Sequence, residues 1–139
     1  LLEVDPADFE HATAVSATGG LLCAQAAVSD MLAGDGGTVI FSGATTSLRG
    51  RDGAIGFSAA KFAARGMAES MARELGPEGI HVAHVVIDGG IRPPDGPRAG
   101  EASEYLDPDA VAQRYLHLVE QDRSAWTLEL DPRPNVEEF

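Results

Sequence analysis

Residues 72–87 read ARELGPEGIHVAHVVI, and this stretch indicates the fold class. A helical pattern ends at Leu75, because the Gly76-Pro77 pair that follows cannot continue a helix. The next run, residues 80–87, is almost continuously apolar. Such a run is typical of a strand that is covered on both faces, as in a parallel sheet with helical crossovers. The stretch therefore predicts an α/β protein.

The rest of the chain repeats the alternation of helix and strand. Asp5-Pro6 and Asp107-Pro108 each place a capping carboxylate before a proline at the first helical position. The predicted helices cover residues 6–32, 57–75 and 108–120, and the predicted strands cover residues 38–42, 80–87 and 126–130. Short connections between alternating elements favour one parallel α/β domain over residues 1–139.

Composition excludes several classes of partner. The net charge of −12 would repel nucleic acid and anionic membranes, which are bound through positive charge. No apolar run approaches the ~20 residues of a membrane span, and no signal peptide opens the chain. We therefore expect a cytoplasmic protein with no nucleic-acid or membrane partner. The single cysteine, Cys23, excludes an internal disulfide, and we expect it to be buried as a small apolar residue.

The histidines do not form a metal-ligand pattern. His81 and His84 are three apart on a predicted strand, so they point to opposite faces and cannot share an ion. A structural role or a place at the rim of a site is expected for both. With one cysteine and no clustered histidines, no metal site is predicted.

Lys61 is the only lysine in the chain, whereas nine other basic positions hold arginine. It follows Phe57 by four residues, so both side chains lie on the same face of the predicted helix. A compact ammonium retained at this one position indicates a site that needs a point charge. Chance within a biased composition is the alternative interpretation.

The order of these motifs resembles the C-terminal half of a short-chain dehydrogenase/reductase. The matching pieces are a glycine-bounded strand, a polar loop at 44–56, the aromatic-x-x-x-Lys pair, and residues 72–82, which are close to the family's A-x-E-x-x-x-x-G-I-x-V. The resemblance runs from about residue 5 to residue 130. It implies a Rossmann-like parallel sheet flanked by helices, without the N-terminal βαβ nucleotide-binding units. The family's T-G-x-x-x-G-x-G turn is absent, and the glycines of 34–37 precede a strand instead of joining a strand to a helix.

The resemblance also assigns site residues one at a time. The family's catalytic tyrosine falls on Phe57, which has no ionisable proton. The family's lysine, which holds the nicotinamide ribose, falls on Lys61. The family's serine, thirteen residues before the tyrosine, falls on Ala44, with Ser42 and Thr45 close enough to substitute.

Three further positions complete the implied site. The family's helix asparagine falls on Ser16, and the cofactor contacts after the sixth strand fall near Asp88 and Gly89. The segment 88–106 corresponds to a mobile substrate loop, at whose end Tyr105 could supply a phenol.

Two functions are compatible with these residues. The first is a divergent oxidoreductase that transfers hydride between NAD or NADP and a carbonyl or alcohol substrate. The second is a catalytically impaired relative that acts as a binding or oligomerisation module. In either case the resemblance implies a homodimer or homotetramer formed through the helices at about 6–32 and 57–75. A sheet of only three strands would otherwise expose an edge and an apolar face.

Overall fold

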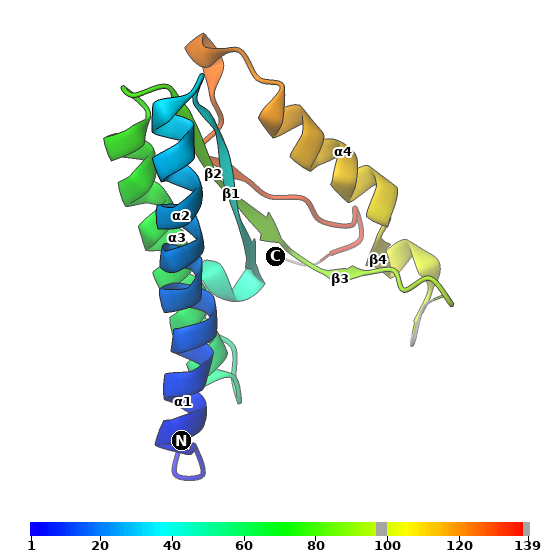
Figure 1. Ribbon diagram of the computed structural model, residues 1–139. Helices are drawn as coiled ribbons and strands as arrows, with labels where there is room; N and C mark the ends of the chain where they lie inside the picture. The colour runs from blue at the N-terminus through cyan, green and yellow to red at the C-terminus, as the bar shows by residue number, and fades with distance from the viewer. Residues whose placement is uncertain (97–99, 138–139) are drawn as a thin grey trace.

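A computed structural model describes residues 1–96 and 100–137 of the chain. Its centre is a parallel sheet in the order β1-β2-β5, formed by β1 (Gly37–Ala44), β2 (Ile80–Ile87) and β5 (Glu129–Leu130). The pairing of β1 with β2 runs from Gly37 opposite Ile80 to Ala44 opposite Ile87. Helices cover both faces of this sheet (Figure 1). The predicted α/β class and parallel sheet are confirmed.

One face of the sheet carries α3 (Ile55–Leu75), whose buried alanines pack on β2. Ala68, Ile80 and Val82 form the buried core there. The helix begins two residues before the predicted start at Phe57, because Ser58 already donates its backbone N–H to the carbonyl of Ala54.

The opposite face carries α4 (Pro108–Val119), where Leu118 packs with Ala83 and Val85. Asp107 caps this helix, because its carboxylate accepts the N–H groups of Asp109 and Ala110. Residues 80–86 of β2 are all buried between the two helical layers. This burial accounts for the continuous apolar run from which the strand was predicted.

The predicted helix at 6–32 is observed as three consecutive helical segments, α1 (Pro6–Thr13), the π-helical η1 (Ala14–Thr18) and α2 (Gly19–Ala33). Asp5 caps the first of them through the N–H of Ala7 at 2.8 Å. Gly20 allows close approach to the sheet, because a Cβ there would lie 3.2 Å from the Phe41 ring.

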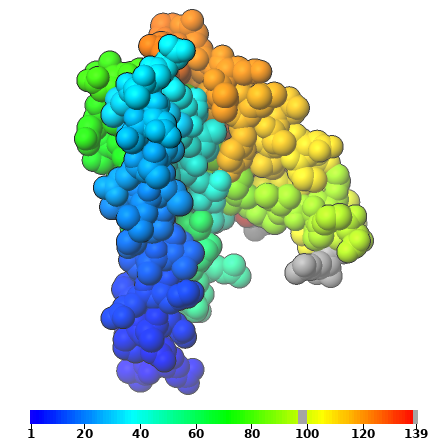
Figure 2. Space-filling view, in the orientation of Figure 1, coloured from blue at the N-terminus to red at the C-terminus, as the bar shows by residue number. Residues whose placement is uncertain are grey.

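This helical segment is exposed along much of its length (Figure 2). Val15 and Leu22 are 61 % and 60 % exposed, and the prediction that Cys23 is buried was wrong. Within the described residues nothing covers that side of α2. By length and composition Pro6–Ala33 could cross a membrane, although no such segment was expected. This is weak evidence, since core helices of soluble proteins and signal sequences pass the same test.

Two regions near the C-terminus differ from the prediction. Strand β5 is confined to Glu129–Leu130, because Trp126 follows a 3-10 turn (Arg123–Ala125) and stacks on His81 instead of pairing in the sheet. In the predicted loop 88–106, β3 (Gly90–Ile91) pairs in parallel with β4 (Tyr105–Leu106), after a 3-10 turn at Ala102–Glu104. Residues 97–99 of that loop lie outside the described part, and its mobility stays a prediction.

Candidate functional site

The candidate site lies where β1 and β2 end at their carboxyl edge, the position at which open α/β sheets bind ligands. A pocket of about 720 Å³ opens there. Its lining residues come from the end of β1, the following loop, the start of α3 and the turn after β2, and include Ala44, Thr45, Arg49, Phe57, Gly89 and Gly90.

Lys61 lies beside this pocket and contacts both β1 and Phe57. Its Nζ donates a hydrogen bond to the carbonyl of Ser42 at 3.0 Å and lies 5.5 Å from the centroid of the Phe57 ring. Burial lowers the pKa of Lys61, because removal of water disfavours the charged amine. The ammonium and the ring therefore share one helix face, as the i, i+4 spacing predicts.

Ser42 and Ala44, two residues apart near the end of β1, have different surroundings. The Ser42 hydroxyl is 2.7 Å from the hydroxyl of Tyr115 on α4, so this hydroxyl is engaged on the face opposite α3. Only its carbonyl reaches Lys61. Ala44 lines the pocket, and its N–H donates to Oγ of Ser47 at 3.0 Å. Of the two hydroxyls expected to replace the family's serine, Thr45 lines the pocket and Ser42 does not.

Asp88 is the buried charge of the site, with a relative exposure of 2 %. The Thr45 hydroxyl donates to its carboxylate, and Arg133 and Arg49 lie 3.2 Å and 3.8 Å from it. Asp88 thus joins the loop after β1 to the end of β2. Gly89 follows with φ of 141°, and a Cβ there would lie 3.0 Å from the Pro134 ring.

Ser16 occupies the π-helical turn η1, which packs against α3. Single π turns inside helices are frequent at functional sites. Among the described residues no hydrogen bond joins Ser16 to Lys61, so the part expected of the family's asparagine stays a prediction.

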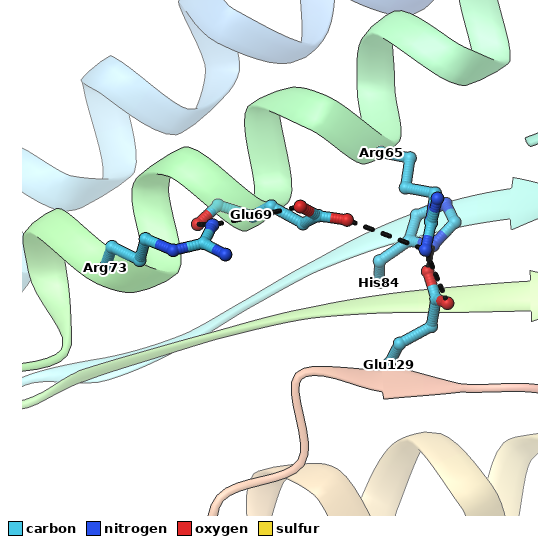
Figure 3. Close-up of polar contacts among 5 residues, drawn as sticks. All are labelled: Arg65, Glu69, Arg73, His84 and Glu129. Carbon is cyan, nitrogen blue, oxygen red and sulfur yellow. Dashed lines mark hydrogen bonds and ion pairs between the residues drawn. The ribbon is translucent and has the colours of Figure 1, made fainter.

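A polar cluster lies one helical turn along α3 from Lys61 (Figure 3). Arg65 binds Glu129 with two hydrogen bonds, of 2.6 Å and 3.1 Å, and Nδ1 of His84 is 3.0 Å from the same carboxylate. Burial lowers the pKa of His84 despite the nearby carboxylate. For Glu129 burial alone would raise the pKa, but hydrogen bonds from Arg65 and His84 outweigh it and the net shift is downward.

Sequence reasoning missed Tyr115, Glu129 and Arg133, which come from distant parts of the chain. The phenol that reaches the end of β1 belongs to Tyr115, whereas Tyr105 lies in β4. No local motif marks these residues, because their partners are 73, 45 and 45 positions away. Within 1–96 and 100–137, no three potential metal ligands come together.

Known proteins similar to this chain share both its sequence and its architecture. A curated relative, a 3alpha-hydroxysteroid dehydrogenase of Mediterraneibacter gnavus, is 34 % identical over 77 residues, which are 55 % of this chain and 31 % of that protein. A solved short-chain dehydrogenase from Rhodopseudomonas palustris is 38 % identical, with a TM-score of 0.81, and covers 96 % of this chain and 55 % of its own.

A more distant structure shows the same fold. The alcohol dehydrogenase of Thermococcus sibiricus, complexed with 5-hydroxy-NADP, is 18 % identical with a TM-score of 0.82 and covers 99 % of this chain and 58 % of its own. The chain thus spans about a third to a little over half the length of the proteins it matches. The sequence model of the short chain dehydrogenases matches residues 1–94. With the site geometry described above, this match shows that the chain belongs to the short-chain dehydrogenase family.

Proposed function

We propose that this protein is an NAD(P)-dependent oxidoreductase that interconverts a carbonyl and an alcohol. The observation that supports this most directly is the position of Lys61. Its ammonium has three N–H donors, and among the described residues one of them binds the carbonyl of Ser42. The other two are available to hydroxyl groups of a ligand in or beside the pocket that Phe57 lines.

The residues present fit the nicotinamide riboside part of the cofactor. Lys61 would hold the ribose hydroxyls, and Gly89 and Gly90, which line the pocket after β2, would lie beside the nicotinamide. The sequence contains no T-G-x-x-x-G-x-G turn for the phosphates, so the fit extends to that part alone. When bound, the nicotinamide would accept or supply a hydride.

Proton transfer is assigned to residues other than Phe57, which lacks an ionisable group. Burial lowers the pKa of Lys61 and so makes its ammonium a better proton donor than a free lysine. The Thr45 hydroxyl lines the pocket and is oriented by Asp88. We infer that both groups bind the oxygen of the substrate's carbonyl or alcohol, and that Lys61 supplies the proton when a carbonyl is reduced.

The test uses the polypeptide as the cell makes it, whether this chain or a longer one that contains it. NADH and NADPH are titrated and binding is followed by nicotinamide fluorescence and calorimetry. We expect saturable binding that weakens about tenfold or more in Lys61→Met, because a charge-assisted hydrogen bond is lost. No binding of either nucleotide at millimolar concentration would refute the proposal.

A second variant tests the chemistry. Phe57→Tyr adds a hydroxyl to a ring whose centroid lies 5.5 Å from the Lys61 ammonium, and we expect carbonyl reduction to accelerate by about 10²–10⁴. Phe62→Tyr, on the same helix and similarly exposed, is the matched control and should leave the rate unchanged. Equal rates in both variants would show that the pocket is not built for this reaction.

The protein is also proposed to form a homodimer or homotetramer through α2 and α3. Large apolar side chains stay exposed on these helices, among them Leu22 at 60 % and Ile55 at 40 %. Light scattering should give twice or four times the monomer mass, and Leu22→Glu should lower it. No described contact favours a purely structural module over an enzyme, so the oligomer is proposed as the assembly of the oxidoreductase. A cytoplasmic location stays a prediction.

A further inference from the structure

His84 is almost completely buried, with an exposure of 1 %, and one of its two ring nitrogens has no partner among the described residues. Nδ1 is held by Glu129, which is held in turn by Arg65 (Figure 3). Nε2 is the unpaired atom. Buried polar atoms are rarely left without a partner in folded proteins, so this one calls for an explanation.

The unpaired nitrogen lies against the end of β1. A Cβ built at Gly43 would overlap with Nε2 of His84 and lie 2.6 Å from the hydroxyl oxygen of Ser47. Gly43 is therefore required here because the imidazole occupies the space that a side chain would take. The residue before it, Ser42, supplies the carbonyl that binds Lys61 at 3.0 Å.

We propose that His84 is a positioning residue for Lys61. Arg65 and Glu129 orient the imidazole, the imidazole supports the β1 backbone at Gly43, and that backbone presents the Ser42 carbonyl to the ammonium. The role in catalysis rests on the proposed function, but the positioning itself does not require the nucleotide. It can therefore be measured on the protein alone.

The charges that face His84 fix how it responds to protonation. Lys61 and Arg65 approach from α3 and Glu129 from β5, while Gly43 and Ser47 on the β1 side are uncharged. Protonating His84 would add a third cation beside Lys61 and Arg65, and of the two nearby carboxylates Glu129 contacts His84 while Glu69 contacts Arg65. Because both charges act in a partly buried region, protonation of His84 should lower the proton affinity of Lys61 and disturb its contact with Ser42.

The experiment exploits the fact that Lys61 is the only lysine. Protein labelled with ¹³C and ¹⁵N in lysine gives one side-chain signal, which is followed by NMR from pH 4 to pH 11 together with the histidine ring signals. We expect the Lys61 signal to show a second inflection at the pH where His84 titrates. The inflection should vanish in His84→Ala. In that variant the proton-binding constant of Lys61 should also differ from that of the wild type by about threefold or more. His117→Ala, which removes an exposed imidazole, is the control and should leave the signal as it is.

Two further variants keep the test decisive if His84→Ala does not fold. His84→Asn can keep the hydrogen bond to Glu129 without the distal nitrogen, and should keep the fold but lose the inflection. Gly43→Ala should displace the Lys61 signal, and the double variant Gly43→Ala/His84→Ala should return it toward that of His84→Ala alone. A Lys61 signal that is identical in wild type, His84→Asn and Gly43→Ala at every pH would overturn the proposal. If the wild-type protein shows the second inflection of the Lys61 signal but binds neither nucleotide, the proposed function is refuted and the positioning role of His84 stands.

Discussion

His81 and His84 lie three residues apart on the same buried strand, yet their surroundings differ completely. On the α4 face, the two nitrogens of His81 lie 3.0 Å and 2.9 Å from the carbonyls of Leu118 and Thr127, and its ring stacks on Trp126. On the α3 face, His84 has a carboxylate at one nitrogen and no described partner at the other. The strand places them on opposite faces, as the spacing of three requires.

This difference indicates that His81 serves in packing, whereas His84 supports the candidate site. Both nitrogens of His81 face backbone carbonyls, so its ring lies between the end of α4 and the segment before β5 and points toward no described pocket residue of the candidate site. Nε2 of His84 lies against the backbone at Gly43, next to the Ser42 carbonyl that accepts a hydrogen bond from Lys61. Two residues of one type, equally buried, thus stabilise the fold in one case and support the candidate site in the other. The expected effects of mutation follow this division.

The largest loss of stability is expected on the packing face. His81→Ala removes a stacked ring, leaves a void beneath Trp126 and removes the ring nitrogens that face the carbonyls of Leu118 and Thr127. We expect the free energy of unfolding to fall by about 3 kcal/mol. Urea denaturation followed by Trp126 fluorescence measures it, with the exposed His117→Ala as the control. A loss equal to that of the control would mean that the stack contributes nothing.

A smaller loss is expected when the cluster on the site face is broken. Glu129→Leu leaves Arg65 and Nδ1 of His84 without their acceptor, and both carboxylate and guanidinium are about one-third exposed. We expect the free energy of unfolding to fall by about 2 kcal/mol, which is less than the loss for a fully buried ion pair. Glu69→Leu removes only i, i+4 pairs at 3.6 Å and 3.8 Å and should cost about 0.5 kcal/mol. Equal losses in the two variants would mean that the hydrogen bonds of Glu129 stabilise the fold no more than the ion pairs of Glu69.

The dependence of stability on pH should come in part from His84. Its pKa is lowered in the folded state by burial, so the unfolded chain binds the proton more readily. Its contribution to stability is therefore complete above about pH 6.5 and is lost as the pH falls toward the lowered pKa. The slope from one proton is at most about 1.4 kcal/mol for each pH unit. Denaturation at pH 7, 6 and 5 should show a shallower decline in His84→Leu than in His11→Gln, whose imidazole is exposed.

The smallest effect is expected at the hydrogen bond between Ser42 and Tyr115. Tyr115→Phe removes one contact of 2.7 Å between hydroxyls at an exposed position. We expect the free energy of unfolding to fall by about 0.5 kcal/mol or less, because water can replace the lost hydroxyl as a partner of Ser42. The Lys61 signal should not move, since only the Ser42 carbonyl contacts the ammonium. A displaced Lys61 signal would show that the α4 face also takes part in positioning it.

Much of the fold could be predicted because it follows from local patterns. The apolar run of β2 and the Asp-Pro caps of α1 and α4 fall where the sequence places them. The predicted strand at 126–130 is found only at Glu129–Leu130, because Trp126 stacks on the His81 ring, a tertiary contact that local propensity does not predict. Cys23 was predicted to be buried from its apolar neighbours, but burial also depends on what covers the helix.

The sequence alone determined the alternation of helix and strand, the resemblance to the family, and the pairing of Phe57 with Lys61, because each depends on residues that are near one another in the chain. The tertiary structure decided which hydroxyl enters the pocket and which faces α4. It also brought Glu129 to His84 and Arg133 to Asp88 across 45 residues. Such contacts depend on how the sheet aligns distant segments, and a buried charge or imidazole acquires its chemistry only from the partners that this alignment supplies.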